Sequence, residues 1–186
     1  MKKESPLLNA KKSVVVVIDL QTKILNAVEA SDVLLRKAER IVEAASWLEI
    51  PVLYSEQNPK GLGPTHPDMA NMLKKVPKLE KTSFSLFGVA KFREWTQKLK
   101  GKQVILLGVE SHICILQTAL DLVTHGECDV FAVADAMGSR SISNHKLALN
   151  RMESQGVNIV SLEMVLMEWL RGSGHKDFKV VQGLIK

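Results

Sequence analysis

The sequence predicts an α/β fold of the doubly wound class, with a mostly parallel open sheet and helices on both faces. Residues 14–18, 104–107 and 130–134 are continuously apolar and rich in valine and isoleucine, as strands covered on both faces are. Stretches with apolar residues at helical spacing lie between these runs. A chain of 186 residues is long enough for one large core, so residues 1–186 are expected to form a single domain.

The remaining elements keep strand and helix in alternation along the chain. Residues 51–54 predict a shorter strand that begins with a proline, and residues 158–160 predict a brief edge strand. Alternation implies right-handed crossovers, with helices packed on both faces of the sheet. The Gly- and Pro-rich residues 56–65 are too many for a minimal turn and predict a functional loop. The apolar stripes that predict helices are Leu34, Ala38, Ile41, Ala45 and Leu48; Phe92, Trp95 and Leu99; Leu116, Ala119, Leu120 and Val123; and Leu162, Val165, Leu166, Trp169 and Leu170.

The composition is that of an ordinary globular protein. Hydrophobic residues make up 46% and charged residues 24%, and no stretch approaches the roughly 20 apolar residues of a membrane span. The run 14–18 is short and is interrupted by Asp19, so it is not a signal peptide. The two cysteines, Cys114 and Cys128, have no metal-binding spacing and are expected to be free thiols. We therefore expect a cytoplasmic protein, or one of a similar compartment, without membrane partners.

The formal net charge is +5 and comes from lysines spread along the chain. Such lysines can attract an anionic substrate or nucleic acid. The sequence lacks the aromatic interleaving of an RNA-binding surface, which disfavours a basic RNA-binding or nuclease-like protein. Salt-dependent binding to RNA would revive that alternative. Dinucleotide binding is also disfavoured, because the first strand leads into Asp-Leu-Gln-Thr-Lys and not into a Gly-rich turn.

Cys114 stands at the start of an amphipathic segment, shortly after the apolar run 104–107. A cysteine at a helix N-terminus lies among unpaired backbone N–H groups and at the positive end of the helix dipole, and both favour the thiolate. This position predicts a nucleophile. The alternative is a small buried apolar residue, as most free cysteines are.

Asp19 and Lys81 are the candidate partners of this cysteine. Asp19 ends the first strand, at the rim where open parallel sheets bind ligands, and a carboxylate with a raised pKa there suits a base for a thiol. Lys81 is flanked by apolar and aromatic residues and is expected to point inward, where its charge would favour the thiolate. The alternatives are a capping or loop-holding role for Asp19 and a surface position for Lys81.

Together these motifs resemble the isochorismatase-like cysteine hydrolase superfamily over nearly the whole chain. Its Asp, Lys, Cys triad corresponds to Asp19 in Val-Ile-Asp-Leu-Gln, Lys81 in Glu-Lys-Thr-Ser-Phe-Ser and Cys114 in Gly-Val-Glu-Ser-His-Ile-Cys. Residues 55–65 and the motif Asp-Ala-Met-Gly-Ser-Arg at 135–140 resemble the isochorismatase domain-containing branch, whose natural substrates are poorly defined. The resemblance implies a Rossmann-like three-layer fold.

The resemblance also implies a mechanism. Asp19 accepts the proton of Cys114, and the thiolate attacks an amide-like C–N bond of a small molecule to form a thioester. The peptide bond between Val109 and Glu110 is implied to be cis, with the backbone N–H groups of Glu110 and Cys114 as the oxyanion hole. Relatives that cleave the vinyl ether of isochorismate lack the cysteine, so isochorismate is disfavoured as the substrate.

No metal and no other cofactor is expected. Nicotinamidase-type relatives bind a metal through an Asp-x-His pattern after the second strand, and the corresponding residues here are Gln57 and Pro59. His66 lies nearby, but a metal site needs several ligands. The chemistry is therefore expected to depend on the triad alone.

The resemblance further suggests pocket residues and a homo-oligomer. Gln57, Phe84, Phe87 and His112 are the candidate pocket residues, with core packing or loop hydrogen bonding as the alternative. The competing functional hypothesis is a non-catalytic oligomeric interaction protein on the same fold. Candidate interface residues near the C-terminus are Trp169, Val180, Val181, Leu184 and Ile185.

Overall fold

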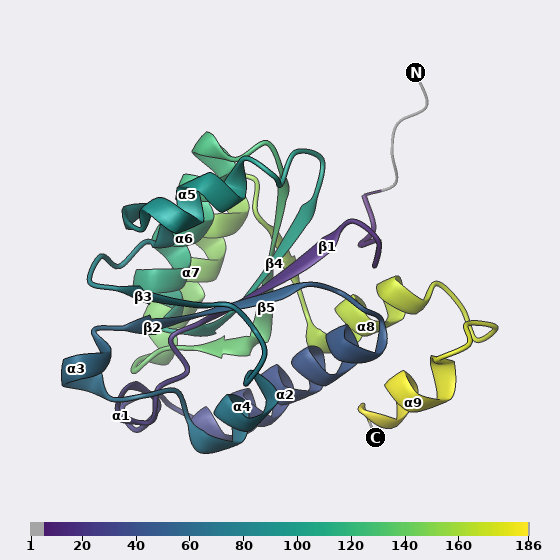
Figure 1. Ribbon diagram of the computed structural model, residues 1–186, viewed down its shortest axis with the longest axis horizontal. Coiled ribbons are helices and arrows are strands. Elements are labelled where there is room, and N and C mark those ends of the chain that lie inside the picture. Colours follow the sequence, from purple (N-terminus) through teal and green to yellow (C-terminus); the bar gives the residue numbers. More distant parts are fainter. Residues whose placement is uncertain (1–5, 186) are drawn as a thin grey trace.

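The computed structural model describes residues 6–185 and has a six-stranded sheet at its centre (Figure 1). All strand pairs are parallel, and the order across the sheet is β3-β2-β1-β4-β5-β6. From β1 the chain adds β2 and β3 toward one edge of the sheet. It then returns to the other side of β1 and adds β4, β5 and β6 toward the opposite edge. The strands are β1 (Ser13–Ile18), β2 (Val52–Gln57), β3 (Lys78–Lys81), β4 (Gln103–Val109), β5 (Asp129–Gly138) and β6 (Asn158–Val160). The predicted doubly wound fold is confirmed.

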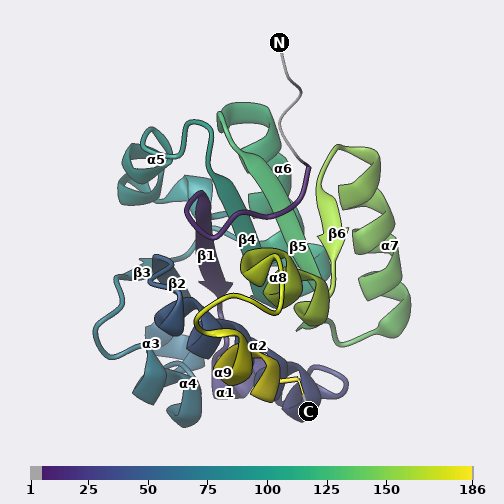
Figure 2. The same cartoon turned by 90° about the vertical axis from the view of Figure 1, so that its right-hand side faces the viewer.

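Helices cover both faces, and β6 with α7 beside it closes the side opposite β3 (Figure 2). The helices are α1 (Thr22–Leu25), α2 (Ser31–Trp47), α3 (Pro59–Leu62), α4 (Pro67–Met72), α5 (Ala90–Thr96), α6 (Leu116–His125), α7 (Ile142–Ser154), α8 (Leu162–Leu170) and α9 (Phe178–Gly183), with a 3₁₀ turn at Leu86–Gly88 and a π turn at Ser111–Ile115. Within residues 6–185, none of these helices has the length and apolar character needed to cross a membrane.

The apolar run of β1 feeds two cores. Val15 and Val17 pack with α2, α4 and α8, while Val14, Val16 and Ile18 pack with α5, α6 and α7. All of these side chains are buried, and each contributes on the order of 1.5–3 kcal/mol relative to exposure. Burial on both faces explains why this strand lacks polar alternation.

The structure corrects the expectation of a loop at residues 56–65. Strand β2 continues to Gln57, and α3 occupies Pro59–Leu62. Pro59 favours this helix because its fixed φ suits a first helical position. The side-chain Nε2 of Gln21 donates to the carbonyl groups of Gln57 and Gly63, at 2.9 and 2.6 Å, and so holds both ends of the segment.

Two elements lack a clear signal in the sequence. Strand β3 contains three charged residues and only alternate buried positions, so it has no apolar run. Helix α7 buries only Ala148 and Met152, which is too weak a stripe to stand out. Near the C-terminus, Trp169 and Val181 are buried in the chain's own core and are therefore not interface residues.

Candidate active site

Neighbouring strands end at one edge of the sheet and form a crevice there. Ile18, the last residue of β1, is paired with Ser55 of β2 and Gly108 of β4. Gly108 permits this approach, because its φ is +121° and a Cβ at this position would lie 2.0 Å from the carbonyl oxygen of Ile18. Strands β2 and β3 end together, since Gln57 is paired with Lys81. Residues at and just beyond these strand ends face the same crevice.

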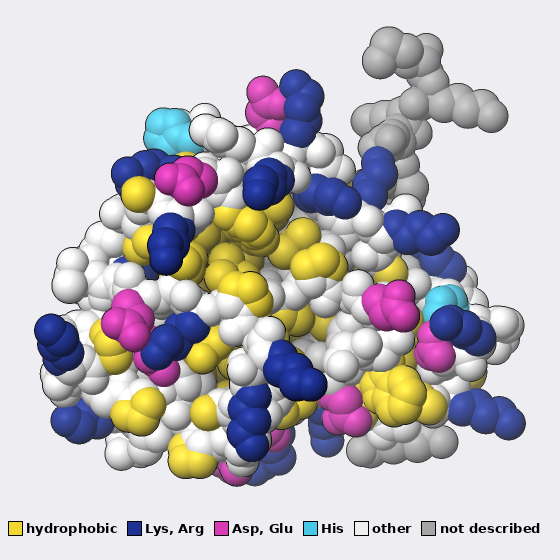
Figure 3. Space-filling model, viewed as in Figure 1, with side chains coloured by type: hydrophobic (Ala, Val, Ile, Leu, Met, Phe, Trp, Pro, Cys, Tyr) yellow, Lys and Arg dark blue, Asp and Glu magenta, His cyan; other side chains and the backbone are white. Residues whose placement is uncertain are grey.

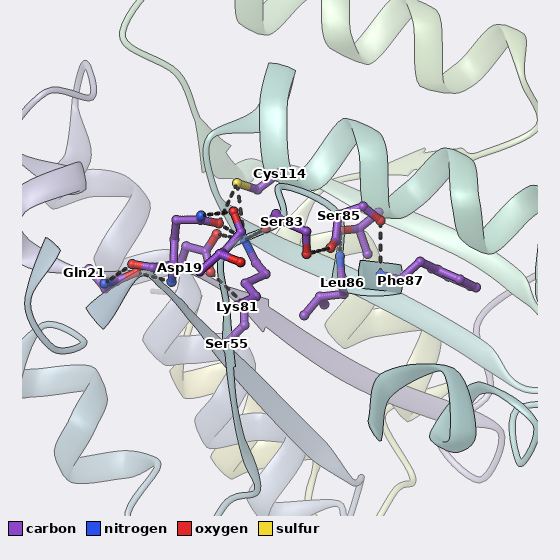
Figure 4. Close-up of polar contacts among 12 residues, drawn as sticks. Asp19, Gln21, Ser55, Lys81, Ser83, Ser85, Leu86, Phe87 and Cys114 are labelled. Carbon is purple, nitrogen blue, oxygen red and sulfur yellow. Dashed lines mark hydrogen bonds and ion pairs between the residues drawn. The ribbon is translucent and has the colours of Figure 1, made fainter. Parts of the chain in front are cut away.

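Asp19, Lys81 and Cys114 meet in this crevice (Figure 4). Nζ of Lys81 lies 2.6 Å from Oδ2 of Asp19 and 3.5 Å from Sγ of Cys114. The side chains of Asp19 and Lys81 are 0% exposed, and Cys114 is 6% exposed. The structure thus brings the three residues suggested by sequence into one buried cluster of a carboxylate, an ammonium group and a thiol.

Strand β2 supplies hydrogen bonds to both members of the ion pair. Ser55 Oγ donates to Oδ1 of Asp19 at 2.7 Å, and Gln57 Oε1 accepts from Nζ of Lys81 at 2.5 Å. Nε2 of Gln57 donates to the carbonyl of Thr82 at 2.8 Å, which fixes the direction in which the amide faces. Buried charges need such partners to compensate for lost hydration. Ser55 and Gln57 therefore hold Asp19 and Lys81 in one arrangement.

A tight turn directs Asp19 into the crevice. Its φ of 54° lies in the left-handed region, which aspartate tolerates better than most residues. The N–H of Gln21 donates to the carbonyl of Asp19 at 2.6 Å and closes the turn. Because the turn follows β1 directly, the carboxylate stays beside the neighbouring strand ends.

The segment that carries Cys114 is anchored by helix α7 and the loop before it. The Val109–Glu110 peptide bond is cis, and the π turn Ser111–Ile115 follows it. Nδ1 of His145 lies 3.1 Å from the hydroxyl of Ser111, and Nδ1 of His112 lies 2.9 Å from the hydroxyl of Ser139. Single π turns occur frequently at functional sites. These contacts fix the turn that presents the thiol.

Burial, and after it the negative charge of Asp19, raise the pKa of the Cys114 thiol to about 12 against the opposing effect of Lys81. The resting thiol is therefore protonated. This corrects the expectation of a resting thiolate, because desolvation and the adjacent carboxylate outweigh the effect of Lys81.

Glu110 and Arg140 form an ion pair next to the cysteine. Arg140 donates to the carboxylate of Glu110 through Nε at 3.1 and 3.2 Å and through Nη2 at 2.6 Å, and its backbone N–H adds a bond of 2.9 Å. Burial alone would raise the pKa of Glu110, but the hydrogen bonds and the charge of Arg140 outweigh it and lower that pKa. Glu110 is buried, whereas the Arg140 side chain is 60% exposed.

A cavity of about 220 Å³ opens beside this cluster. Cys114, Gln57 and Glu110 contribute its polar lining, and Lys23 and Arg140 are exposed residues that also line it. The rest of the wall is apolar and includes Ile24, Ala27, Leu62, Phe84, Val109 and Ile113. The arrangement offers a nucleophile and a potential base next to a small, mostly apolar space.

Comparisons with known proteins identify the family of this chain. The model of the isochorismatase domain matches residues 13–164. The chain belongs to the isochorismatase family. The isochorismatase domain-containing protein 2 of Xenopus laevis is 39% identical over 180 residues, which cover 96% of this chain and 85% of that protein.

Solved structures show the same fold. The MAR1 ribonuclease of Caenorhabditis elegans superposes with a TM-score of 0.90 at 34% identity, covering 96% of this chain and 92% of that one. The YcaC gene product of Escherichia coli, described as an octameric hydrolase of unknown specificity, has a TM-score of 0.90 at 22% identity and covers 99% and 91% of the two chains. The resemblance seen in the sequence is thus confirmed, and the family places the chain in a hydrolase superfamily.

The candidate pocket residues fall into two groups. Gln57 and Phe84 line the cavity, and Phe84 is 53% exposed. Phe87 points away from the triad (Figure 4) and packs edge-on against Phe92, with ring centroids 5.5 Å apart. His112 bonds to the loop before α7. For Phe87 and His112 the structure therefore supports the alternative of packing and loop hydrogen bonding.

Three further residues of the site received no role from the sequence. Ser55 lies one residue beyond the predicted end of its strand, so a longer strand would have placed it beside Asp19. Gln21 and Arg140 belong to the motifs Val-Ile-Asp-Leu-Gln and Asp-Ala-Met-Gly-Ser-Arg, which carried the resemblance, but their partners come from distant segments. Their place in these motifs was the one sequence feature that could have indicated a role in the site.

The residues at the metal position of nicotinamidase-type relatives do not fit a metal. The Oε1 of Gln57 accepts a hydrogen bond from Lys81, and Pro59 has no side-chain donor atom. Among residues 6–185 no group of three or more His, Cys, Asp and Glu side chains is arranged to hold an ion. Gln57 and Pro59 therefore do not reproduce the ligands of the nicotinamidase-type site.

Proposed function

We propose that the protein is a cysteine hydrolase that cleaves an amide-like C–N bond of a small molecule through a thioester, with Asp19, Lys81 and Cys114 as its triad. The observation that carries this function is the buried cluster in which one ammonium group contacts both a carboxylate and a thiol beside a cavity. A nucleophile next to a base is the arrangement that covalent hydrolysis requires.

Because the thiol is protonated at rest, it needs a base, and the adjacent carboxylate of Asp19 takes that role in this proposal. The carboxylate takes the proton from Sγ of Cys114 as sulfur attacks the carbonyl carbon, forming the C–S bond and an oxyanion. Lys81, which is paired with Asp19 at rest, lies 3.5 Å from the sulfur and stabilises negative charge there as it develops. The backbone N–H groups of Glu110 and Cys114 hold the oxyanion.

Three further proton transfers complete the cycle. The C–N bond breaks, the amine departs with the proton from Asp19, and the acyl group remains on Cys114 as a thioester. Water then gives a proton to Asp19 and adds to the thioester carbonyl. When the C–S bond breaks, the acid leaves and the proton returns to sulfur, which restores the resting state.

The cavity beside Cys114 suits a small molecule. Its volume of about 220 Å³ corresponds to only about seven water molecules at roughly 30 Å³ each. A ribonuclease is the second candidate, because one relative at 34% identity carries that name. The small volume and mainly apolar wall of the cavity favour the small-molecule function.

The decisive experiment is an assay of small primary amides with wild-type protein and Cys114→Ser. Release of ammonia by the wild type, loss in the variant, and an acyl group trapped on the peptide that contains Cys114 would support the proposed function. An RNA substrate in the same series tests the second candidate. Equal ammonia release by both proteins, or RNA cleavage that requires Cys114 without any amide turnover, would overturn the amidase proposal.

Assembly and location belong to the same proposal. We expect residues 1–186 to act as one domain in a homo-oligomer in the cytoplasm, and a protein of the same fold is described as octameric. Light scattering coupled to size-exclusion chromatography measures the copy number directly. A monomer at micromolar concentration would contradict the oligomer.

A further inference from the structure

Two basic residues from distant parts of the chain line the cavity that contains Cys114. Lys23 belongs to α1, and Arg140 stands just before α7. Both are exposed, so they border the solvent side of a cavity whose nucleophile is buried. The rest of the lining is mainly apolar. A ligand in this cavity therefore has both positive charge and the thiol within the same lining.

Arg140 has hydrogen-bonding capacity to spare. Its Nε and Nη2 groups contact the carboxylate of Glu110, and within residues 6–185 no hydrogen bond engages Nη1. The ion pair holds the planar guanidinium in a fixed orientation with one edge available. Guanidinium groups bind carboxylates through such edges with defined geometry.

Lys23 is held toward the same space. Its Nζ donates to the carbonyl of Gly61 at 3.0 Å, which ties α1 to α3 and uses one of the three ammonium protons. The carbonyl carries no net charge, so the lysine keeps its full positive charge. Lys23 thus adds a second cation to the lining beside Arg140's guanidinium group.

The charges around the cavity do not cancel. Lys23, Lys81 and Arg140 are positive, and the carboxylates of Asp19 and Glu110 are negative, so three cations face two anions and leave a net charge of +1. The Cys114 thiol is neutral at rest. A net positive charge beside low-dielectric walls raises the local concentration of negatively charged ligands.

We propose that Lys23 and Arg140 form an anion subsite that binds a carboxylate of the substrate, so that the substrate class is a small amide that also carries a carboxylate, such as the half-amide of a short dicarboxylic acid. The apolar wall then contacts the methylene groups between the two ends. The amide part of this inference rests on the proposed hydrolase function, whereas the anion subsite itself does not.

Protection of Cys114 from alkylation tests the subsite through occupancy of the cavity, and acylation by succinamide would only raise the protection that this neutral control gives. Succinate and succinamide have the same number of non-hydrogen atoms but differ in charge. Each is added during iodoacetamide labelling at pH 9 and fixed salt, with labelling of Cys114 and Cys128 followed by peptide mass spectrometry. We expect succinate to slow Cys114 labelling at about ten-fold lower concentration than succinamide, and Cys128 to be unaffected.

Lys23→Met should reduce the succinate effect about five-fold or more, while Lys60→Met, an exposed lysine of α3 outside the lining, should leave it unchanged. Arg140→Lys, which keeps a charge opposite Glu110, should weaken protection through loss of the planar edge. Equal protection by succinate and succinamide, or an effect of Lys60→Met as large as that of Lys23→Met, would overturn the inference.

A turnover comparison separates this inference from the proposed function. Succinamate should show a lower KM than butyramide, and Lys23→Met should raise the KM for succinamate alone by about ten-fold with kcat unchanged. If succinate protects Cys114 but no amide is hydrolysed, the hydrolase proposal fails and the subsite stands. If both amides are hydrolysed with equal KM and succinate gives no protection, the subsite fails and the hydrolase stands.

Discussion

The cavity beside Cys114 and a groove along strands β2 and β3 lie at opposite ends of the same strands. The groove is more than four times larger, at about 980 against 220 Å³, and is lined by the first residues of β2 and β3, by Trp95 of α5 and by several lysines. Figure 3 shows hydrophobic side chains gathered in the middle of the face in view, with lysine and arginine side chains around them. The lining of the groove has no cysteine, histidine or carboxylate.

The difference shows that volume does not locate the chemistry in this fold. At the carboxyl ends of parallel strands, each chain leaves the sheet through a turn, so polar residues from separate segments converge. At the amino ends, chains enter the sheet through apolar residues that complete the core. The smaller cavity therefore has the reactive groups, and variants in the two regions should behave differently.

The largest difference is expected for the nucleophile. Cys114→Ala should reduce kcat/KM for amide hydrolysis by about 1,000-fold or more, because the covalent intermediate cannot form. Lys74→Met in the groove should leave kcat/KM within about two-fold. Steady-state kinetics with both purified variants checks this contrast. A Cys114→Ala variant that keeps a tenth of the wild-type kcat/KM would contradict the role of Cys114 as nucleophile.

The ion pair should affect both activity and stability. Lys81→Met leaves Asp19 as a buried charge without its partner, which should cost about 3–5 kcal/mol of unfolding free energy. Lys74→Met should change it by less than about 0.5 kcal/mol. Urea unfolding measures both values. The double variant Asp19→Asn with Lys81→Met should regain stability but not activity, and a recovery of activity would exclude the triad.

A smaller effect is expected on thiol reactivity. Because the Cys114 pKa is about 12, its alkylation by iodoacetamide should rise with each pH unit through pH 10. Asp19→Asn removes a charge that raises this pKa, so labelling of Cys114 at pH 8 should become about ten-fold faster while hydrolysis is lost. Burial also raises the pKa of Cys128, to about 11, and its labelling should not respond. Half-maximal labelling of wild-type Cys114 near pH 8.5 would contradict the buried-thiol description.

The smallest functional effect is expected for the groove's aromatic residue. Trp95 is half-buried and packs against Phe92, with ring centroids 5.5 Å apart. Trp95→Ala should lower the free energy of unfolding by about 2 kcal/mol through lost packing. The kcat/KM of the folded variant should stay within about two-fold. A larger loss of kcat/KM at unchanged folded fraction would show that the two regions are coupled.

Much of the fold could be predicted because its signals are local. Strand β1 is buried on both faces, and a strand of this kind can be recognised in the sequence as a continuous apolar run. The helix Ser31–Trp47 likewise has a clear apolar stripe. Strand β3 could not be found this way, since three of its residues are charged and its pairing with β2 is a long-range property.

The sequence by itself determined the doubly wound class, the family and the identity of the three residues that meet in the crevice, because hydrophobic period and short motifs are written along the chain. Only the tertiary structure decided the protonation state of Cys114, since burial and the charge of Asp19 act through space. It also separated Phe84, which lines the cavity, from Phe87, which packs against Phe92. Distances between residues far apart in sequence set both results, and no local pattern encodes such distances.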